Sequence, residues 1–325
     1  MKCLSRLLSI FLCFILVFGI TGCGSEDLPM QYGSITTNEN YIIDSTSEQT
    51  QMTLFASDYC ATIDDVTNSS TVDYSGLYAA GIYDLNDKEV LYSYQANEHI
   101  NPASLTKIMT ALVVFDNCNL DDIVTIGDVT ITEDGVQLFN LQTGDQISVR
   151  NLLYITMVYS GNDAALALAQ HVAGTEEAFV QMMNDKAYSL GATNTNFTNP
   201  HGLSDENHYT SAYDLYLIFR AAVQYDEFIQ LINTASYTVN YTHADGEEAS
   251  RTITSTNKYL TQDYSCPNQI SIIGGKTGST MAAGKCIILY ATDSLNNPYI
   301  CIVMGASDEE TLYQTMTQLC EDSIH

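Results

Sequence analysis

Basic side chains are scarce in this chain. Its 325 residues include 11 Lys and Arg against 39 Asp and Glu, which gives a formal net charge of −28. Such a chain cannot assemble a basic patch that neutralises phosphates, so nucleic acid is excluded as a partner. Electrostatic attachment to anionic lipid is excluded for the same reason. The acidity is enough to keep an exposed protein soluble, and the few basic residues become informative by their positions.

Two other kinds of pattern are missing. The nine cysteines form no C-x-x-C pair and have no metal-ligand spacing. Cys286 and Cys301 fall inside apolar runs that are typical of strands, so we expect mostly buried free thiols. No βαβ alternation, glycine-rich phosphate loop or internal repeat is present. We expect neither a metal nor a cofactor.

The apolar run near the N-terminus is short for a membrane span. Lys2 and Arg6 precede apolar-rich residues 7–20, whereas a span needs about 20 residues. The run suits a signal peptide, and it ends in Ile20-Thr21-Gly22-Cys23, which resembles a bacterial lipobox. We therefore expect residues 1–22 to be a lipoprotein signal peptide and Cys23 to carry a lipid that holds the protein on the outer side of the cell membrane. An ordinary secretory signal with an incidental cysteine is the alternative.

The remaining chain divides into a polar segment and one folded domain. Residues 23–53 contain few large apolar side chains and are predicted to be a disordered tether behind the lipidated cysteine. Residues 54–325 are predicted to fold. A hairpin is expected over 76–95, a helix over 101–116, short strands over 122–149 and a series of helices over 148–232, the last of them one long helix covering 210–232. Three strands over 270–307 and a last helix over 308–323 complete the prediction. Strands at both ends with helices between predict an α/β (α+β) fold, with a sheet built from both termini and packed by helices.

Ser104 and Lys107 lie three residues apart at the start of a predicted helix, so their side chains share one face. A serine hydroxyl is a poor nucleophile until a neighbour takes its proton. A lysine does so if burial and a nearby positive charge lower its pKa from about 10.4. Pro102 suits a helix start, where the helix dipole assists a nucleophile. The same spacing at Ser255 and Lys258 lacks a helical pattern, so spacing alone assigns no function.

Two further motifs follow along the chain. Ser160-Gly161-Asn162 lies in a break between two apolar helices, where it either presents a hydroxyl and an amide to a cleft or only caps a helix. Another S-x-N, at 294–296, falls in a predicted hairpin turn. Lys276-Thr277-Gly278 ends an apolar strand and occurs once. A lysine at a strand edge, followed by a hydroxyl and a glycine that permits close approach, can hold a carboxylate.

S-x-x-K, S-x-N and K-T-G in this order are the signature of penicillin-binding proteins and class A β-lactamases. Residues 100–116, 149–218 and 274–292 closely resemble the D-alanyl-D-alanine carboxypeptidases, and the similarity extends from about Leu54 to the end. Class A β-lactamases are less similar, because no E-x-x-L-N segment lies between the second and third motifs. That interval contains Asn199-Pro200-His201-Gly202-Leu203 instead.

The resemblance implies a role for each residue of the first two motifs. Ser104 would attack the carbonyl between the two terminal D-alanines, with Lys107 as its base. Ser160 would relay the proton towards the leaving amine, and Asn162 would position Lys107 and the substrate amide.

The third motif would hold the substrate. Lys276 and Thr277 would bind the terminal carboxylate within the Lys276-Thr277-Gly278 segment, and Lys276 would help to keep the base neutral. The backbone N–H groups of Ser104 and Ser279 would form the oxyanion hole.

The resemblance also implies a β-lactamase/transpeptidase-like antiparallel sheet with a helical subdomain over 54–325. The partners would be peptidoglycan pentapeptides as substrate and β-lactams as covalent inhibitors, and we expect a monomer. The 47 residues after Gly278 suit two strands and a helix. We therefore expect no additional β-rich domain and no C-terminal anchor, with the lipid on Cys23 replacing the latter.

Three alternatives stay open at this point. A β-lactamase of the same fold is one, and a non-catalytic lipoprotein that binds muropeptides or penicillin is another. Zinc binding is the third, since His201 and His208 lie near Asp205 and Glu206. The spacing of these histidines matches no zinc motif, and the segment resembles the serine family.

Overall fold

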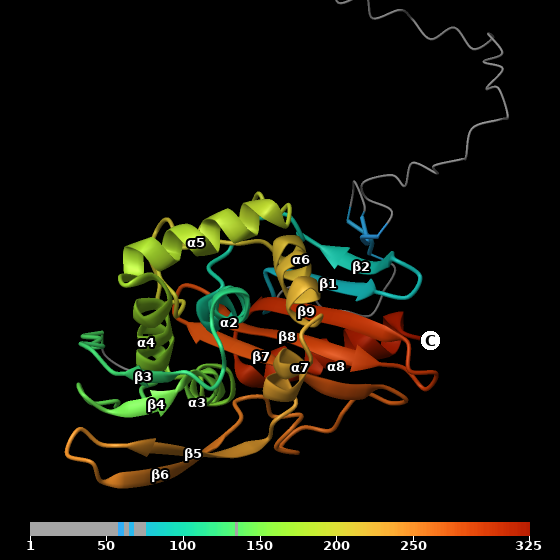
Figure 1. The fold of residues 1–325 in the computed structure, drawn as a ribbon. Helices are drawn as coiled ribbons and strands as arrows, with labels where there is room; N and C mark the ends of the chain where they lie inside the picture. Colours follow the sequence, from blue (N-terminus) through green and yellow to red (C-terminus); the bar gives the residue numbers. More distant parts are fainter. Residues whose placement is uncertain (1–57, 62–64, 68–75, 134–135) are drawn as a thin grey trace, which may run out of the picture. The chain divides into compact units, whose positions relative to one another are not determined.

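The computed structural model describes residues 58–61, 65–67, 76–133 and 136–325 (Figure 1). The signal peptide, the lipidated Cys23 and the tether predicted for residues 23–53 lie outside these residues. Among the helices of the described part, none is both long and apolar enough to cross a membrane.

A five-stranded antiparallel sheet joins strands from the two ends of the sequence (Figure 1), and its strand order is β2-β1-β9-β8-β7. Strand β1 pairs with β9 over its whole length, so the first hairpin extends the sheet of the last three strands. The predicted sheet built from both termini is thereby confirmed, and β7 forms one of its edges. The strands are β1 (Ala79–Asp84), β2 (Glu89–Tyr94), β7 (Ser271–Thr280), β8 (Gly284–Thr292) and β9 (Pro298–Ala306).

Both faces of this sheet are covered. In β9, Ile300 and Ile302 pack into the core formed with the central helices, while Cys301 and Val303 pack into a second core beneath helix α8 (Glu309–Ser323). Successive side chains of a strand point to opposite faces, so a strand buried on both sides is a continuous apolar run. That is why residues 299–304 do not alternate between polar and apolar side chains.

All the described helices except α8 follow the first hairpin and precede the last three strands. Helix α2 is buried from Thr106 to Val114 and contacts α4, α5 and α6. Its start differs from the prediction, because Ser104 lies in a 3₁₀ turn, η2, and the α-helix begins after this turn, at Thr106. The elements are η2 (Ala103–Leu105), α2 (Thr106–Asn117), α3 (Val149–Tyr154), the π-helical turn η3 (Ile155–Tyr159), α4 (Asn162–Ala173), α5 (Glu176–Ser189), α6 (Ala212–Ala222) and α7 (Asp226–Ile232).

The prediction of a single helix over 210–232 is wrong. The chain forms α6 and α7 with a break at 223–225. Tyr225 is held at the end of α2, because its hydroxyl donates to Asp116 Oδ1 (2.6 Å) and its ring stacks on Phe115 at 5.2 Å. Tyr225 therefore takes an extended backbone, and Asp226 starts a new helix there. Periodicity alone cannot reveal such a break, since both helices keep apolar residues at helical spacing.

A second antiparallel sheet has the order β3-β4-β5-β6. Only the two ends of the predicted strand-rich interval 122–149 are strands, namely β3 (Ile123–Thr125) and β4 (Gln146–Ser148). The hairpin of β5 (Ser236–Thr242) and β6 (Glu248–Thr254) was not predicted. Its signal was present as Asp245-Gly246 between two β-forming runs, and Gly246 takes a φ of +90° at the turn.

Candidate active site

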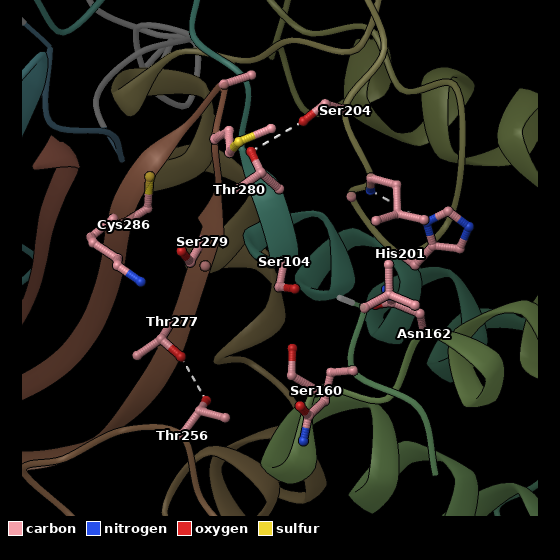
Figure 2. A pocket seen from close by; sticks show the side chains of 18 of the residues that line it. Ser104, Ser160, Asn162, His201, Ser204, Thr256, Thr277, Ser279, Thr280 and Cys286 are labelled. Atoms are coloured by element: carbon pink, nitrogen blue, oxygen red, sulfur yellow. Dashed lines mark hydrogen bonds between the residues drawn. The ribbon is translucent and has the colours of Figure 1, made fainter. Parts of the chain in front are cut away.

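Ser104 lies in the 3₁₀ turn η2 and lines a cleft of about 730 Å³ (Figure 2). Pro102 begins the turn, and Ala103 has a φ of +49°, a conformation that non-glycine residues adopt rarely. Strand β7 passes alongside: a Cβ on Gly278 would lie 3.1 Å from Ser104 N and 3.0 Å from Pro102 O. Glycine in the K-T-G motif therefore allows the sheet edge to approach the serine turn.

Lys107 is fully buried below Ser104. Its Nζ lies 2.9 Å from Ser104 Oγ, 2.6 Å from Asn162 Oδ1 and 2.6 Å from the backbone oxygen of His201. The S-x-x-K pair, the S-x-N asparagine and the segment 199–203 thus converge on one amine.

The pKa of Lys107 lies well below its ordinary value. Burial is the largest cause, and the positive charge of Lys276 adds to it, while Asp163 acts in the opposite direction. A neutral amine has two N–H donors and one lone pair. Asn162 Oδ1 and His201 O are acceptors, so they take both donors and leave the lone pair for the Ser104 hydroxyl. The geometry therefore suits a base rather than an ammonium ion.

Ser160 connects the second motif to the third. It ends the π-helical turn η3 with a left-handed backbone (φ +67°), which turns its side chain into the cleft (Figure 2). Lys276 Nζ donates to Ser160 Oγ at 3.0 Å and to Thr277 O at 2.8 Å. Burial lowers the pKa of Lys276 to about 7. A hydrogen-bonded line of polar groups is therefore available across the cleft.

The sheet side of the cleft is the edge strand β7, where Thr277, Gly278 and Ser279 follow one another (Figure 2). Thr277 Oγ1 donates to Thr256 Oγ1 at 2.6 Å. Ser204 Oγ donates to Thr280 Oγ1 at 3.1 Å, which links the loop after the 199–203 segment to β7. All eight residues singled out in the three motifs and at Ser279 lie at this cleft or directly beneath it.

Asp163, next to Asn162, was not singled out from the sequence. Its buried carboxylate accepts the backbone N–H groups of Phe139 (3.0 Å), Asn140 (2.7 Å), Leu141 (3.1 Å) and Ala164 (3.0 Å). The preceding loop is tied to the same helix start, because Asn162 N donates to Gln137 O at 2.9 Å. Asp163 therefore fixes the loop that borders the cleft opposite β7. An acidic residue in the first turn of a helix was the available signal.

The segment 199–203 closes against the serine turn. A Cβ on Gly202, whose φ is +88°, would lie 1.8 Å from Ala103 O. His208 Nδ1 accepts the backbone N–H of Thr198 at 3.0 Å, so its proton is on Nε2 and is donated to Thr106 Oγ1 at 2.8 Å. Thr106 in turn donates to Ala103 O. The ring is thus a structural support of the turn.

The second S-x-x-K is no helical pair. Ser255 and Lys258 lie outside any helix, and Lys258 forms an ion pair with Glu309. The S-x-N at 294–296 lies in the turn between β8 and β9, as predicted. The cysteines are free thiols throughout the described residues; Cys60, Cys286, Cys301 and Cys320 are buried, Cys118 is half-buried and Cys266 is exposed.

Comparison with known proteins identifies related sequences and folds. Residues 75–308 match the family described as D-alanyl-D-alanine carboxypeptidase, peptidase S11. The carboxypeptidase DacF of Bacillus subtilis is 32% identical over 72% of this chain and 58% of its own length. A D-alanyl-D-alanine endopeptidase of Pseudomonas aeruginosa is 34% identical over 74% of this chain and 75% of its own.

Among solved structures, the Streptomyces K15 DD-transpeptidase superposes with a TM-score of 0.71 at 29% identity, covering 76% of this chain and 97% of that chain. The chain therefore spans nearly all of this enzyme but only 58% of the length of the Bacillus relative. These likenesses confirm the predicted β-lactamase/transpeptidase-like fold.

Proposed function

Because the chain belongs to the D-alanyl-D-alanine carboxypeptidase family, we propose that it is a serine-type D-alanyl-D-alanine carboxypeptidase that trims peptidoglycan stem peptides. The observation that carries the proposal is the environment of Lys107. Its amine lies 2.9 Å from Ser104 Oγ, and both of its N–H donors are directed to other acceptors. Burial and Lys276 hold its pKa low enough for the amine to accept a proton.

Acylation follows from this arrangement. Lys107 takes the Ser104 proton while Oγ bonds to the carbonyl carbon between the two terminal D-alanines. The oxyanion is stabilised by the backbone N–H groups of Ser104 and Ser279. Ser160 passes a proton to the departing nitrogen as the C–N bond breaks, and D-alanine leaves. Water then hydrolyses the ester and restores Ser104.

Substrate binding uses the free edge of β7. An extended peptide can pair with an unpaired strand edge, which places its backbone beside Thr277, Gly278 and Ser279. Lys276 and Thr277 bind the terminal carboxylate, and the Asn162 amide contacts the substrate backbone while it orients Lys107. The proposed substrate is the peptidoglycan pentapeptide, and β-lactams acylate the same serine.

Release of D-alanine from diacetyl-Lys-D-Ala-D-Ala tests the proposal. We expect the full-length protein to release D-alanine and to be labelled by fluorescent penicillin, and Ser104→Ala to do neither. Labelling without release of D-alanine would indicate a penicillin-binding protein without carboxypeptidase activity. A folded protein that does neither would support the non-catalytic binding function instead.

The same acyl-enzyme can be resolved by an amine, and the relatives include an endopeptidase and a DD-transpeptidase. The assay should therefore include an acceptor amino acid and a cross-linked dimer. Rapid turnover of nitrocefin would favour a β-lactamase, whereas slow release of the penicilloyl group would favour the carboxypeptidase.

The proposed location is the outer side of the cell membrane, where the peptidoglycan substrate lies. We propose that residues 1–22 are cleaved, that Cys23 carries a lipid and that residues 23–53 are a tether to the catalytic domain, which acts as a monomer. A fatty-acid probe supplied to growing cells should label the parent protein and not Cys23→Ala. Label that persists in the variant would exclude lipidation at this cysteine.

A further inference from the structure

Lys285 is the one basic residue in the described part of the chain that has no hydrogen bond or ion pair to the protein. Of the nine Lys and Arg that follow residue 57, the other eight all have a partner, which is a carboxylate, a hydroxyl, an amide or a backbone oxygen. In a chain with 39 acidic residues, a lysine with neither a carboxylate nor any other polar partner is unexpected. Lys285 is half-buried and lines the active-site cleft.

The register of the sheet places Lys285 beside the K-T-G motif. Lys285 is the second residue of β8 and lies directly opposite Ser279 of β7, and Thr277 lies opposite Ile287. Directly paired residues of antiparallel strands point to the same face, and alternate residues of one strand do so too. Lys285, Ser279 and Thr277 therefore share a face, and Thr277 is a diagonal neighbour within reach of a long side chain.

This face is the one covered by helix α8. Ile287 packs into the core beneath α8, and Glu309 and Leu312 of α8 line the same cleft. Glu309 does not neutralise Lys285, because its carboxylate pairs with Lys258. Lys276 lies on the opposite face of β7, where it contacts Ser160. An anion at the edge of β7 is thus approached by one lysine from each face of the strand.

The terminal carboxylate of the substrate is an anion of this kind, and Lys276 alone matches it incompletely. Two of the Lys276 donors already go to Ser160 Oγ and Thr277 O. Its pKa is about 7, so near neutral pH only part of the population is charged. A second, partly exposed lysine beside Thr277 supplies the charge that Lys276 lacks.

We propose that Lys285 is a specificity-determining residue that binds the terminal carboxylate of the substrate from the α8 side of β7. The inference rests on the proposed carboxypeptidase function and adds to it the residue that selects a free carboxyl terminus. Lys285 acts on substrate binding and does not exchange protons with the nucleophile.

Two peptides separate this role from a structural one. Diacetyl-Lys-D-Ala-D-Ala has one carboxylate, at its terminus, and the corresponding D-alaninamide peptide has none. For Lys285→Met we expect kcat/KM on the carboxylate peptide to fall about tenfold to a hundredfold, because one charge-assisted hydrogen bond is lost. On the amide peptide we expect a change of less than about threefold, since no such bond exists there.

Further variants test the charge itself. Lys285→Arg should retain most of the activity, and Lys285→Glu should prefer the amide peptide over the carboxylate peptide. Lys88→Met, on the distant β1–β2 turn, is the matched control and should change neither value. Lys285→Gln serves as a second neutral variant if Lys285→Met does not fold.

Equal losses on the two peptides, or no loss on the carboxylate peptide, would overturn the inference while leaving the carboxypeptidase intact. The inference would also be overturned if kcat/KM fell only for a stem peptide whose third residue, in place of lysine, carries its own carboxylate. Lys285 would then bind that third residue. If the parent protein releases no D-alanine and is not acylated by penicillin, the proposed function fails first and this inference fails with it.

Discussion

Asp163→Asn is the substitution that most directly tests how the cleft is built. The Asp163 carboxylate accepts four backbone N–H groups, two on each oxygen. Asparagine keeps one acceptor oxygen and replaces the other with an NH₂ group, so two backbone donors lose their partner. Because the site is buried, these donors can regain hydrogen bonds to water only in part.

The expected loss of stability can be worked from these contacts. A hydrogen bond to a charged group contributes about 1.5–3 kcal/mol, so two such bonds set an upper range of about 3–6 kcal/mol. The loop at 137–141 borders the open cleft and can rehydrate in part, which brings the expectation to about 3 kcal/mol in the free energy of unfolding. For a domain of this size that corresponds to a melting temperature lowered by about 6–12 °C.

Asp163→Asn also changes the pKa of Lys107, the proposed base. The negative charge of Asp163 favours protonated Lys107, so its removal lowers the pKa of Lys107 further. The base must be neutral to act, hence the acid limb of the pH profile of kcat/KM moves to lower pH. The plateau of the profile falls at the same time, because Asn162 loses the support of the adjacent loop.

Thermal unfolding and the pH profile of D-alanine release measure the two effects. Asp121→Asn is the matched control, since Asp121 is exposed and pairs only with Arg150 at the surface. Its loss should cost less than about 1 kcal/mol. An unchanged melting temperature in Asp163→Asn would show that the loop is held by other contacts. An acid limb displaced to higher pH would contradict the electrostatic argument.

Two further predictions concern the supports of the serine turn. Gly202→Ala should lower the midpoint of urea unfolding by the equivalent of more than about 3 kcal/mol, because its Cβ would overlap Ala103 O at a backbone with positive φ; a midpoint like that of the parent would refute the packing. Burial lowers the pKa of His208 to about 4 and that of His201 to about 3, so both rings are neutral in the folded protein and accept protons near pH 6.5 only when it unfolds. The contribution of these two rings to the free energy of unfolding should therefore be fully present above about pH 6.5 and decrease as the pH falls towards 4. In denaturation curves measured at several pH values, His208→Gln should reduce that decrease.

Several parts of the fold could be predicted because they depend on local patterns. The hairpin over 76–95 and the strands over 270–307 are marked by apolar runs separated by turn residues. Helix α5 is capped at its start by Thr175, whose side chain accepts the Ala178 N–H, and it ends before Gly191. Such signals act within a few residues of one another, so they can be read without knowing the tertiary structure.

Other parts could not be predicted in this way. The break at Tyr225 exists because a tyrosine binds Asp116 at the end of a helix more than a hundred residues earlier. The hairpin of β5 and β6 is a different case, because a local signal for its turn, Asp245-Gly246, was present and was missed. The function of Asp163 is visible only where the loop at 139–141 folds back on it.

The sequence by itself determined the order and type of the reactive groups. Three short motifs contain Ser104, Lys107, Ser160, Asn162 and Lys276, because the proposed nucleophile, base and carboxylate partner each need a particular side chain.

Only the tertiary structure decided the protonation state and the reach of those groups. The pKa of Lys107, the proposed base, is lowered because folding removes the amine from water and brings the charge of Lys276 towards it. Lys285 faces the cleft because the register of β7 and β8 sets it opposite Ser279. Desolvation and charge interactions depend on residues that are distant in the chain, and these are fixed only when the sheet and the helices pack together.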